Sequence, residues 1–299
     1  MVHTELFIFY LGVIMGFPGL CSKDPYVSYL TEVFGCNIIR VPEERYRPLT
    51  VIAARGKHLS FRGNVSPIIK NDIAIPQGLI ANSQMPDLSG RKSRSVKTSF
   101  GLKILDGFLK GLGIPGGSIK NSFQGASMLS FTFQDIKRMW IDINSFGRII
   151  RNHKIDLASP AAAIFFGENP YAFLLLDSVI TSSKFTVSVD RADSTDFKFD
   201  IEGIKNIVGG ISASIDVSTT SGFDLTFNGN KQLAFAFSCV RFSLTDDGTI
   251  GQILPEEGKM VMNYAHLSTD LLSEEERPAI VHSPDRVLLT EEPSMVNIE

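Results

Sequence analysis

Apolar and polar residues alternate most clearly between Ser178 and Leu244. In residues 179–190, the side chains on one face are mainly Val and Phe, and those on the other face are Ser, Lys, Thr and Asp. A period of two residues with one apolar face is typical of a β-strand. Residues 197–201, 211–218 and 223–227 repeat the pattern. This part of the chain therefore predicts a meander of antiparallel strands.

Two features bound the last strand of this meander. Asn228-Gly229 predicts a tight hairpin turn, because both residues tolerate the positive φ that such turns require. Beyond it, residues 233–244 are apolar at odd positions up to Cys239 and at even positions from Val240. This pattern predicts a strand that is either buried on both faces or bulged near Cys239.

Strands of this length can also cross a membrane. About 9–11 residues per strand suffice when a sheet closes on itself in a bilayer. Residues 171–180 and 181–190 each supply that length, with Phe185, Val187 and Val189 as the candidate membrane-strand side chains. A strand of an ordinary sheet has the same pattern, so the alternation leaves both alternatives open.

Residues 100–113 have helical spacing instead. Lys103 and Lys110 fall opposite an apolar stripe formed by Ile104, Leu105, Phe108, Leu109 and Leu112. Glycines within the stretch weaken this prediction, since each costs a helix about 1 kcal/mol relative to Ala. A basic amphipathic helix can lie in a membrane interface or pack against a sheet, and the spacing permits both.

The remaining segments complete the prediction of the fold class. Residues 36–41 and 127–136, and short apolar runs between Leu49 and Ile80, predict further strands. A second helix is expected over residues 141–151. Together these elements predict an α+β fold, with a twisted, mostly antiparallel β-sheet, surrounding helices and a short C-terminal tail.

Charge is distributed unevenly along the 299 residues. The net charge is −3, but the segment from Glu256 onward holds ten acidic and three basic residues, or −7. Residues 1–255 hold 26 basic and 22 acidic residues, or +4. The polar segment 87–98 is a solvated loop or a patch for acidic phosphates, because it carries four basic residues: Arg91, Lys92, Arg94 and Lys97.

No constellation of catalytic or metal-binding residues is evident. The five histidines are scattered and the three cysteines form no CxxC pair, which argues against a metal site or a disulfide framework. Residues 111–116 match GxGxxG, but they follow a helical stretch and contain Pro115, so the context of a dinucleotide site is missing. We interpret the protein as a non-enzyme with neither metal nor cofactor.

The N-terminal segment offers a candidate lipidation site. Residues 6–20 are apolar but too short for a transmembrane helix, and they lack the basic start of a signal peptide. Met15 is an alternative start, which makes residues 1–14 an extension and places Cys21 near the terminus. A cysteine there is a candidate for thioester lipidation, or it packs against the protein.

An ordered series of motifs between Cys21 and Leu254 resembles the bacterial gasdermins. The N-terminal pieces are Cys21-Ser22-Lys23-Asp24-Pro25-Tyr26, Ile39-Arg40-Val41-Pro42 and Arg47-Pro48-Leu49. The later pieces are Gly125-Ala126, Leu129-Ser130-Phe131-Thr132-Phe133, Ile207-Val208-Gly209-Gly210 and Leu233-Ala234-Phe235-Ala236-Phe237.

This resemblance implies an autoinhibited pore-forming protein. In that family a protease encoded nearby removes the C-terminal segment, and the released body forms a homo-oligomer in the anionic inner membrane and kills the phage-infected cell. The protein is then cytoplasmic until it is cleaved, and it binds no nucleic acid. Residues 15–258 would be the pore-forming domain and residues 259–299 the acidic autoinhibitory tail.

The resemblance also assigns roles to individual residues. Cys21 matches the family's palmitoylated cysteine, so covalent palmitate is expected in place of a cofactor. The candidate membrane contacts are Arg91, Lys92, Arg94, Lys97, Lys103 and Lys110. The candidates for the cleavage region are Leu267, Leu271, Leu272, Arg286 and Leu289. The main alternative is a non-enzymatic ligand- or protein-binding β-rich domain with a disordered acidic tail.

Overall fold

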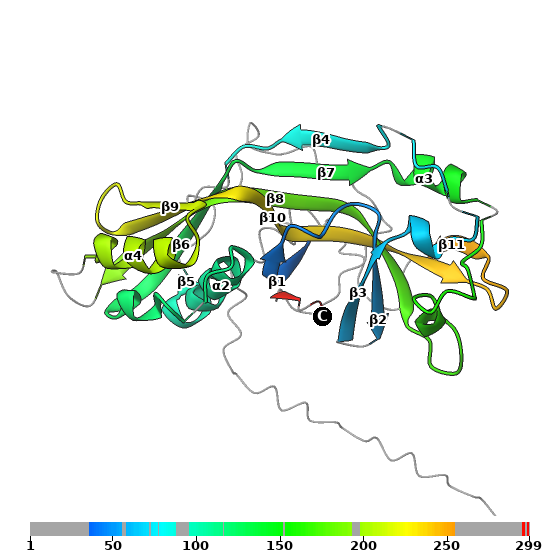
Figure 1. Cartoon of the computed structure of the whole chain (residues 1–299), viewed down its shortest axis with the longest axis horizontal. Coiled ribbons are helices and arrows are strands. Elements are labelled where there is room, and N and C mark those ends of the chain that lie inside the picture. The colour runs from blue at the N-terminus through cyan, green and yellow to red at the C-terminus, as the bar shows by residue number, and fades with distance from the viewer. Residues whose placement is uncertain are drawn as a thin grey trace, which may run out of the picture.

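Two 21-residue strands, β8 (Ala172–Ala192) and β10 (Asp224–Leu244), form the centre of the molecule (Figure 1). They pair antiparallel from Phe173 opposite Phe242 to Ser188 opposite Asp224. The computed structural model describes residues 36–55, 58–71, 73–76, 78–87, 96–115, 117–151, 153–192, 198–254, 295–296 and 298. Within these ranges, every other strand joins β8 or β10 directly or through one neighbour.

Three strands occupy one edge of β8 in succession. β2 (Thr50–Arg55) pairs with its first residues, β7 (Lys137–Ile141) with its middle and β6 (Ala126–Gln134) with its last. The other edge of β8 belongs to β10. One edge of β8 is therefore shared by three short strands, whereas the other edge pairs with the single long strand β10.

The other strands extend the sheet on both sides. β10 also pairs with β1 (Asn37–Glu43), β9 (Ile215–Ser218) and β11 (Ile250–Leu254). The outer strands are β3 (His58–Asn64), β4 (Ile80–Gln84), β5 (Val96–Lys97) and β12 (Met295–Val296). Among these ladders only that of β12 with β1 is parallel, so the predicted α+β fold with a mostly antiparallel sheet is confirmed.

The meander differs from its prediction at Asn228-Gly229. No hairpin forms there, because β10 continues through these residues and shifts register between Asn228 and Leu233. The last part of β10 follows the first alternative: residues 233–240 are buried, and at the register shift between Ser238 and Cys239 the extra residue, Asp177, lies in β8.

The helices lie around the sheet, and one of them replaces predicted strands. α2 (Thr98–Gly111) and α3 (Ile143–Ile150) agree with the predicted helices. The strand expected over 197–201 is wrong in its described residues, and the one expected over 211–218 forms only at 215–218, as β9, because α4 (Ile201–Ile211) lies between them. Helix α4 begins after Asp200, whose carboxylate accepts a hydrogen bond from the N–H of Gly203 at 3.0 Å. Among the described residues no helix has the length and apolarity needed to span a bilayer.

The glycines of α2 are explained by its packing against β1. A Cβ atom at Gly107 would lie 2.0 Å from the carbonyl oxygen of Arg40, and one at Gly111 would lie 2.1 Å from that of Pro42. Any side chain at these positions would push the helix away from the strand. The glycines that weaken the helix by propensity therefore allow its close contact with the sheet.

We predict opposite effects for alanine at two helical glycines. Gly107→Ala should lower the free energy of unfolding by about 1–3 kcal/mol, because the added methyl group overlaps backbone atoms of β1. Gly209→Ala in α4, where an added Cβ meets nothing within 4 Å, should raise it through helix propensity, by about 0.5–1 kcal/mol. Thermal melting of the full chain measures both. Equal effects of the two substitutions would contradict the close approach of α2 to β1.

Candidate functional site

The end of the sheet beside α2 and α4 has one apolar and one polar face. We call it the distal sheet: β6, β9, residues 184–192 of β8 and residues 224–229 of β10. Cross-strand pairing puts Phe133, Phe185, Phe227 and Val217 in one row, Phe131, Val187 and Leu225 in a second, and Leu129 and Val189 in a third. All of these side chains are buried.

The opposite face of the distal sheet is polar. One row across it consists of Thr132, Thr186, Thr226 and Ser218, and the hydroxyls of Thr186 and Thr226 are hydrogen-bonded at 2.8 Å. On the same face, the hydroxyl of Ser130 donates to Asp190 at 3.1 Å. The predicted alternation of β8 is thus confirmed for residues 184–190, whereas residues 173–182 are buried throughout.

Helix α2 covers the apolar face of the distal sheet. The ring centroid of its Phe108 lies 4.9 Å from those of Phe133 and Phe185 and 6.0 Å from that of Phe235. The apolar stripe of α2 therefore packs on the sheet in this state, as in one of the two interpretations of its sequence. Lys103 and Lys110 are exposed, and Lys110 Nζ lies 2.7 Å from Asp106.

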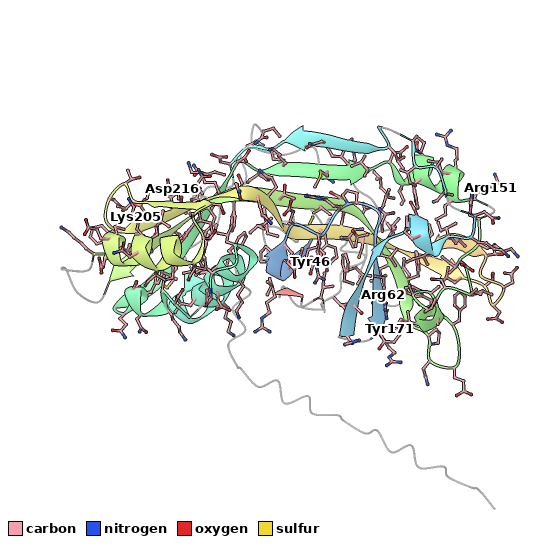
Figure 2. The ribbon with its side chains drawn as sticks, in the orientation of Figure 1. Tyr46, Arg62, Arg151, Tyr171, Lys205 and Asp216 are labelled. Carbon is pink, nitrogen blue, oxygen red and sulfur yellow. The ribbon has the colours of Figure 1, made fainter. Side chains whose placement is uncertain are left out.

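Helix α4 covers the same face by a narrower stripe. Ile204 and Val208 are buried in the hydrophobic cluster that contains the phenylalanine rows, but Ile207 and Ile211 are 38% and 45% exposed. Figure 2 shows Lys205 of α4 at this end of the molecule, far from Tyr171 just before β8. Because two of its five large apolar side chains are exposed, α4 is the less firmly held of the two covers.

The candidate membrane-strand residues lie underneath these helices. Phe185, Val187 and Val189 are all buried and face the cluster that contains Phe108 and Ile204. Contact of these side chains with lipid would require α2 and α4 to move away. Lys97 lies in β5. The remaining site predictions lie outside the described residues: Cys21, Arg91, Lys92, Arg94, Leu267, Leu271, Leu272, Arg286 and Leu289.

The C-terminal end of the chain docks on β1. β12 pairs in parallel with β1, with Met295 opposite Ile38 and Val296 opposite Ile39. Ile298 is 7% exposed and belongs to a cluster that includes Ile39, Tyr46 and Phe237. This docking site was not predicted from the sequence. The only indication of it there is the presence of three apolar residues, Met295, Val296 and Ile298, in an acidic tail.

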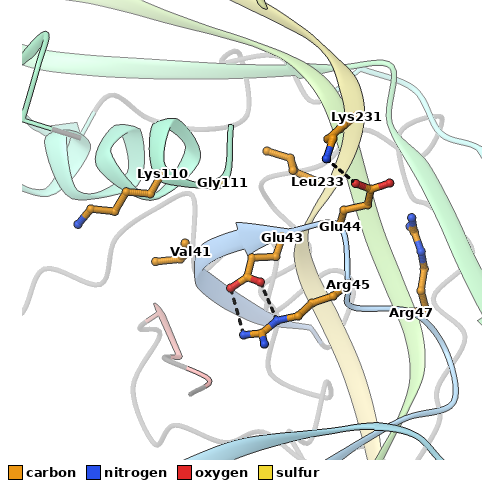
Figure 3. Close-up of a pocket in the computed structure, with 9 residues that line it drawn as sticks. All are labelled: Val41, Glu43, Glu44, Arg45, Arg47, Lys110, Gly111, Lys231 and Leu233. Carbon is orange, nitrogen blue, oxygen red and sulfur yellow. Dashed lines mark hydrogen bonds and ion pairs between the residues drawn. The ribbon is translucent and has the colours of Figure 1, made fainter. Parts of the chain in front are cut away.

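Lys110 also lines a groove of about 660 Å³ between α2, the end of β1 and β10 (Figure 3). Two ion pairs cross it, Glu43 with Arg45 at 2.6 Å and Glu44 with Lys231 at 3.2 Å. The lining holds four basic and two acidic side chains, together with three others: Val41, Glu43, Glu44, Arg45, Arg47, Lys110, Gly111, Lys231 and Leu233. These residues lie in three separate parts of the sequence, so their proximity could not be predicted from it. Their basic side chains could bind an anionic ligand.

A polar cluster marks where the distal sheet begins. We call it the polar clasp: Asp135, Thr181, Ser182, Ser183 and Gln232. Asp135 lies between β6 and β7 with φ of 49°, and its carboxylate accepts hydrogen bonds from Ser183 Oγ at 2.5 Å and from Gln232 Nε2. Gln232 Oε1 accepts in turn from Thr181 Oγ1 at 2.8 Å. The clasp therefore ties β8, β10 and the β6–β7 connection together.

Comparison with known proteins places the chain in a family. The model of the Bacterial Gasdermin Family matches residues 39–252. This chain belongs to the bacterial gasdermin family. Gasdermins are pore-forming proteins rather than enzymes, which agrees with the interpretation made from the sequence. Among the described residues, no group of His, Cys, Asp and Glu is placed to hold a metal ion.

Individual relatives agree with this assignment. The gasdermin of Vitiosangium sp. is 25% identical over 82% of this chain and 90% of its own length. That of a Desulfuromonadales bacterium is 29% identical over 78% and 86%. A solved bacterial gasdermin from Bradyrhizobium tropiciagri superposes with a TM-score of 0.55 at 15% identity, covering 77% of this gasdermin and 90% of that chain. At 15% identity, the similarity to this solved structure shows the fold alone.

The polar clasp gives a pH-dependent prediction. The hydrogen bond from Ser183, with help from Lys137 and the glutamine amides, lowers the pKa of the Asp135 carboxyl below its ordinary 3.8 despite partial burial. A lowered pKa stabilises the fold above 3.8, and this contribution is lost as the pH falls through the folded-state pKa. Asp135→Asn, which keeps the positive φ, should lower the melting temperature at pH 7.

The melting-temperature difference between the wild type and Asp135→Asn should persist on acidification until the pH falls below 3.8, and then shrink. The exposed Asp246→Asn serves as the control and should change the melting temperature little at any pH. A difference for Asp135→Asn that stays constant through the acidic range would show that the carboxylate charge does not stabilise the clasp.

Proposed function

We propose that this gasdermin is an autoinhibited pore-forming protein that is activated when proteolysis removes its C-terminal segment. The observation that carries the proposal is the distal sheet, in which one face is polar and the other is apolar and covered by α2, by α4 and by the segments that carry Phe123 and Phe199. Such a sheet suits a pore, because its apolar face can meet lipid while its polar face meets water.

Two of the four strand segments of the distal sheet have the length of a membrane-crossing strand, whereas residues 224–229 of β10 and the four residues of β9 are shorter. β6 spans nine residues, and residues 184–192 of β8 are also nine. Membrane-crossing strands need about 9–11 residues. Once α2 and α4 leave, the phenylalanine rows would be exposed to water, and a bilayer is the environment in which they are most stable.

The docked C-terminal end supports autoinhibition. β12 and Ile298 are held by β1, and the same strand receives Gly107 and Gly111 of α2 on its backbone. Removing the tail would free one edge of β1 and uncover part of the cluster around Tyr46. The strand that supports the main helical cover would then lose a neighbour, which weakens the closed state.

The change in net charge on loss of the tail also favours binding to an anionic membrane. A cut after Tyr264 changes the net charge of the body from −3 to +3, because residues 265–299 hold eight acidic and two basic residues. Basic residues near an anionic leaflet contribute roughly 1 kcal/mol each to membrane binding. Lys103 and Lys110 on the outer side of α2, and the cations of the groove beside it, are the described residues that we expect to contact anionic inner-membrane lipids.

The family resemblance supplies the remaining parts of the proposal. They are an activating protease encoded nearby, palmitate on Cys21, a cytoplasmic inhibited form, homo-oligomers in the inner membrane, and cell death as a defence against phage. We place the cut within residues 264–290, so that β12 and Ile298 lie in the fragment that is released.

The tail can be tested by weakening its anchor without any cut. Ile298→Asp should cause dye release from anionic liposomes by the intact chain, because the buried isoleucine contributes about 1.5–3 kcal/mol to docking. Ile80→Asp on β4 is the control, since Ile80 is 41% exposed and distant from β12 in the sheet order. Dye release by both variants or by neither would argue against a latch at Ile298.

The orientation of the distal sheet can be tested by lysine substitutions at two neighbouring positions. Val189→Lys puts a charge on the apolar face near the middle of the proposed crossing, at a cost of about 2–4 kcal/mol per subunit. It should abolish dye release by the cleaved protein, whereas Ser188→Lys on the polar face should preserve it. Val189 is 9% exposed, so a lysine there can reach water in the soluble protein.

A protease site inserted after Gly258 allows each lysine variant to be cut in the presence of liposomes. Melting curves of the uncut chains confirm that both variants fold. Release by Val189→Lys at the wild-type rate would exclude this face from contact with lipid.

A further inference from the structure

The regular pairing of the sheet is interrupted at one level in three strands. β6 ends at Gln134 opposite Lys184, and β7 begins at Lys137 opposite Thr181. On the other edge of β8, Asn228 faces Lys184 and Leu233 faces Ser182, so four residues of β10 span the place where β8 has one. A ladder that continued evenly into a membrane would have to remove this break.

The polar clasp holds the break together from both sides. Besides the bonds of Asp135 described above, Ser182 Oγ donates to the carbonyl oxygens of Gln134 at 2.7 Å and Lys184 at 2.8 Å. Gln84 of β4 reaches Asp135 Oδ1 at 3.5 Å, and Lys137 Nζ lies 3.9 Å from the same atom. A charged and strongly hydrogen-bonded cluster of this kind is costly to move into hydrocarbon.

The two sides of the clasp differ in what their strands could expose. Beyond it, β8 has the apolar rows on one face and hydroxyls on the other. Before it, residues 173–182 of β8 and 233–240 of β10 are buried, and they include Asp177, Ser178 and Ser238. Strands that are buried on both sides and carry a carboxylate have no face to offer to lipid.

We infer that the polar clasp is the insertion boundary of this gasdermin. The distal sheet enters the bilayer up to Gln134, Lys184 and Asn228, while the clasp and everything before it stay in the aqueous body at the level of the lipid headgroups. Lys137 and Lys184 flank the clasp at the level of the lipid phosphates. The inference rests on the proposed function, and it excludes residues 171–180, which the sequence analysis also allowed as a crossing strand.

Single-tryptophan variants can locate this boundary. The chain has one tryptophan, Trp140. Every variant in this experiment carries Trp140→Phe, so that its only tryptophan is the one introduced. Two matched pairs then carry tryptophan on either side of the clasp: Phe185→Trp and Phe173→Trp in β8, and Phe227→Trp and Phe237→Trp in β10. All four native rings are at most 2% exposed, so any new contact with acyl chains reports insertion.

Each full-length variant carries the protease site after Gly258 and is cut on vesicles of phosphatidylglycerol and phosphatidylcholine with brominated acyl chains. Tryptophan at 185 and 227 should lose most of its emission, because bromine quenches at contact, whereas tryptophan at 173 and 237 should keep its emission. Equal quenching within both pairs would overturn the boundary. Since each strand has its own pair, a variant that fails to fold leaves the other pair to decide.

Two further results separate the parts of the inference. Adding Asp135→Asn to Phe237→Trp should extend quenching to position 237, past the break, and unchanged emission there would mean that the carboxylate does not set the boundary. Dye release is recorded on parallel vesicles. Release with the wrong quenching pattern contradicts the boundary alone, whereas absence of release from the cut wild type contradicts the proposed function.

Discussion

The apolar face of the distal sheet has to be covered, and the rest of the structure depends on how this is done. Phenylalanine, leucine and valine side chains from four strands form one continuous apolar surface. In water, each Å² of it left open costs about 25 cal/mol. In this structure α2, α4 and the segments that carry Phe123 and Phe199 provide the cover. A bilayer could provide it equally well, which makes these helices exchangeable for lipid.

Strand β1 connects this cover to the end of the chain. Its backbone at Arg40 and Pro42 lies against the two glycines of α2, and Ile38 and Ile39 pair with β12. No separate inhibitory domain is needed in this account, because a few residues on the edge of one strand act on the helix packed against it.

The sequence predicted the elements whose patterns are local and long. The alternation in β8, the stripe in α2 and the double burial of residues 233–240 are all properties of consecutive side chains. Asn228-Gly229 misled because local turn chemistry was overridden by pairing with β8 and β9. The role of Gly107 and Gly111 could not be predicted from local sequence either, because it depends on contact with a strand that lies 60 or more residues earlier.

The candidate site could be predicted only in part. Phe185, Val187 and Val189 were identified by their alternation, but the helices that cover them were not. Ile298 was missed because so few apolar residues give no periodic signal. The polar clasp was also invisible, because Asp135, Ser183 and Gln232 meet only when three strands are aligned.

The central claim is that the helical cover must leave the distal sheet before a pore can form. A disulfide between Leu112→Cys, directly after α2, and Gly229→Cys in β10 tests it, because the Leu112 side chain lies 2.9 Å from where a Cβ on Gly229 would be. The account predicts that the cleaved, oxidised protein releases no dye from anionic liposomes and that a reductant restores release. Equal release by the oxidised and reduced forms would contradict it.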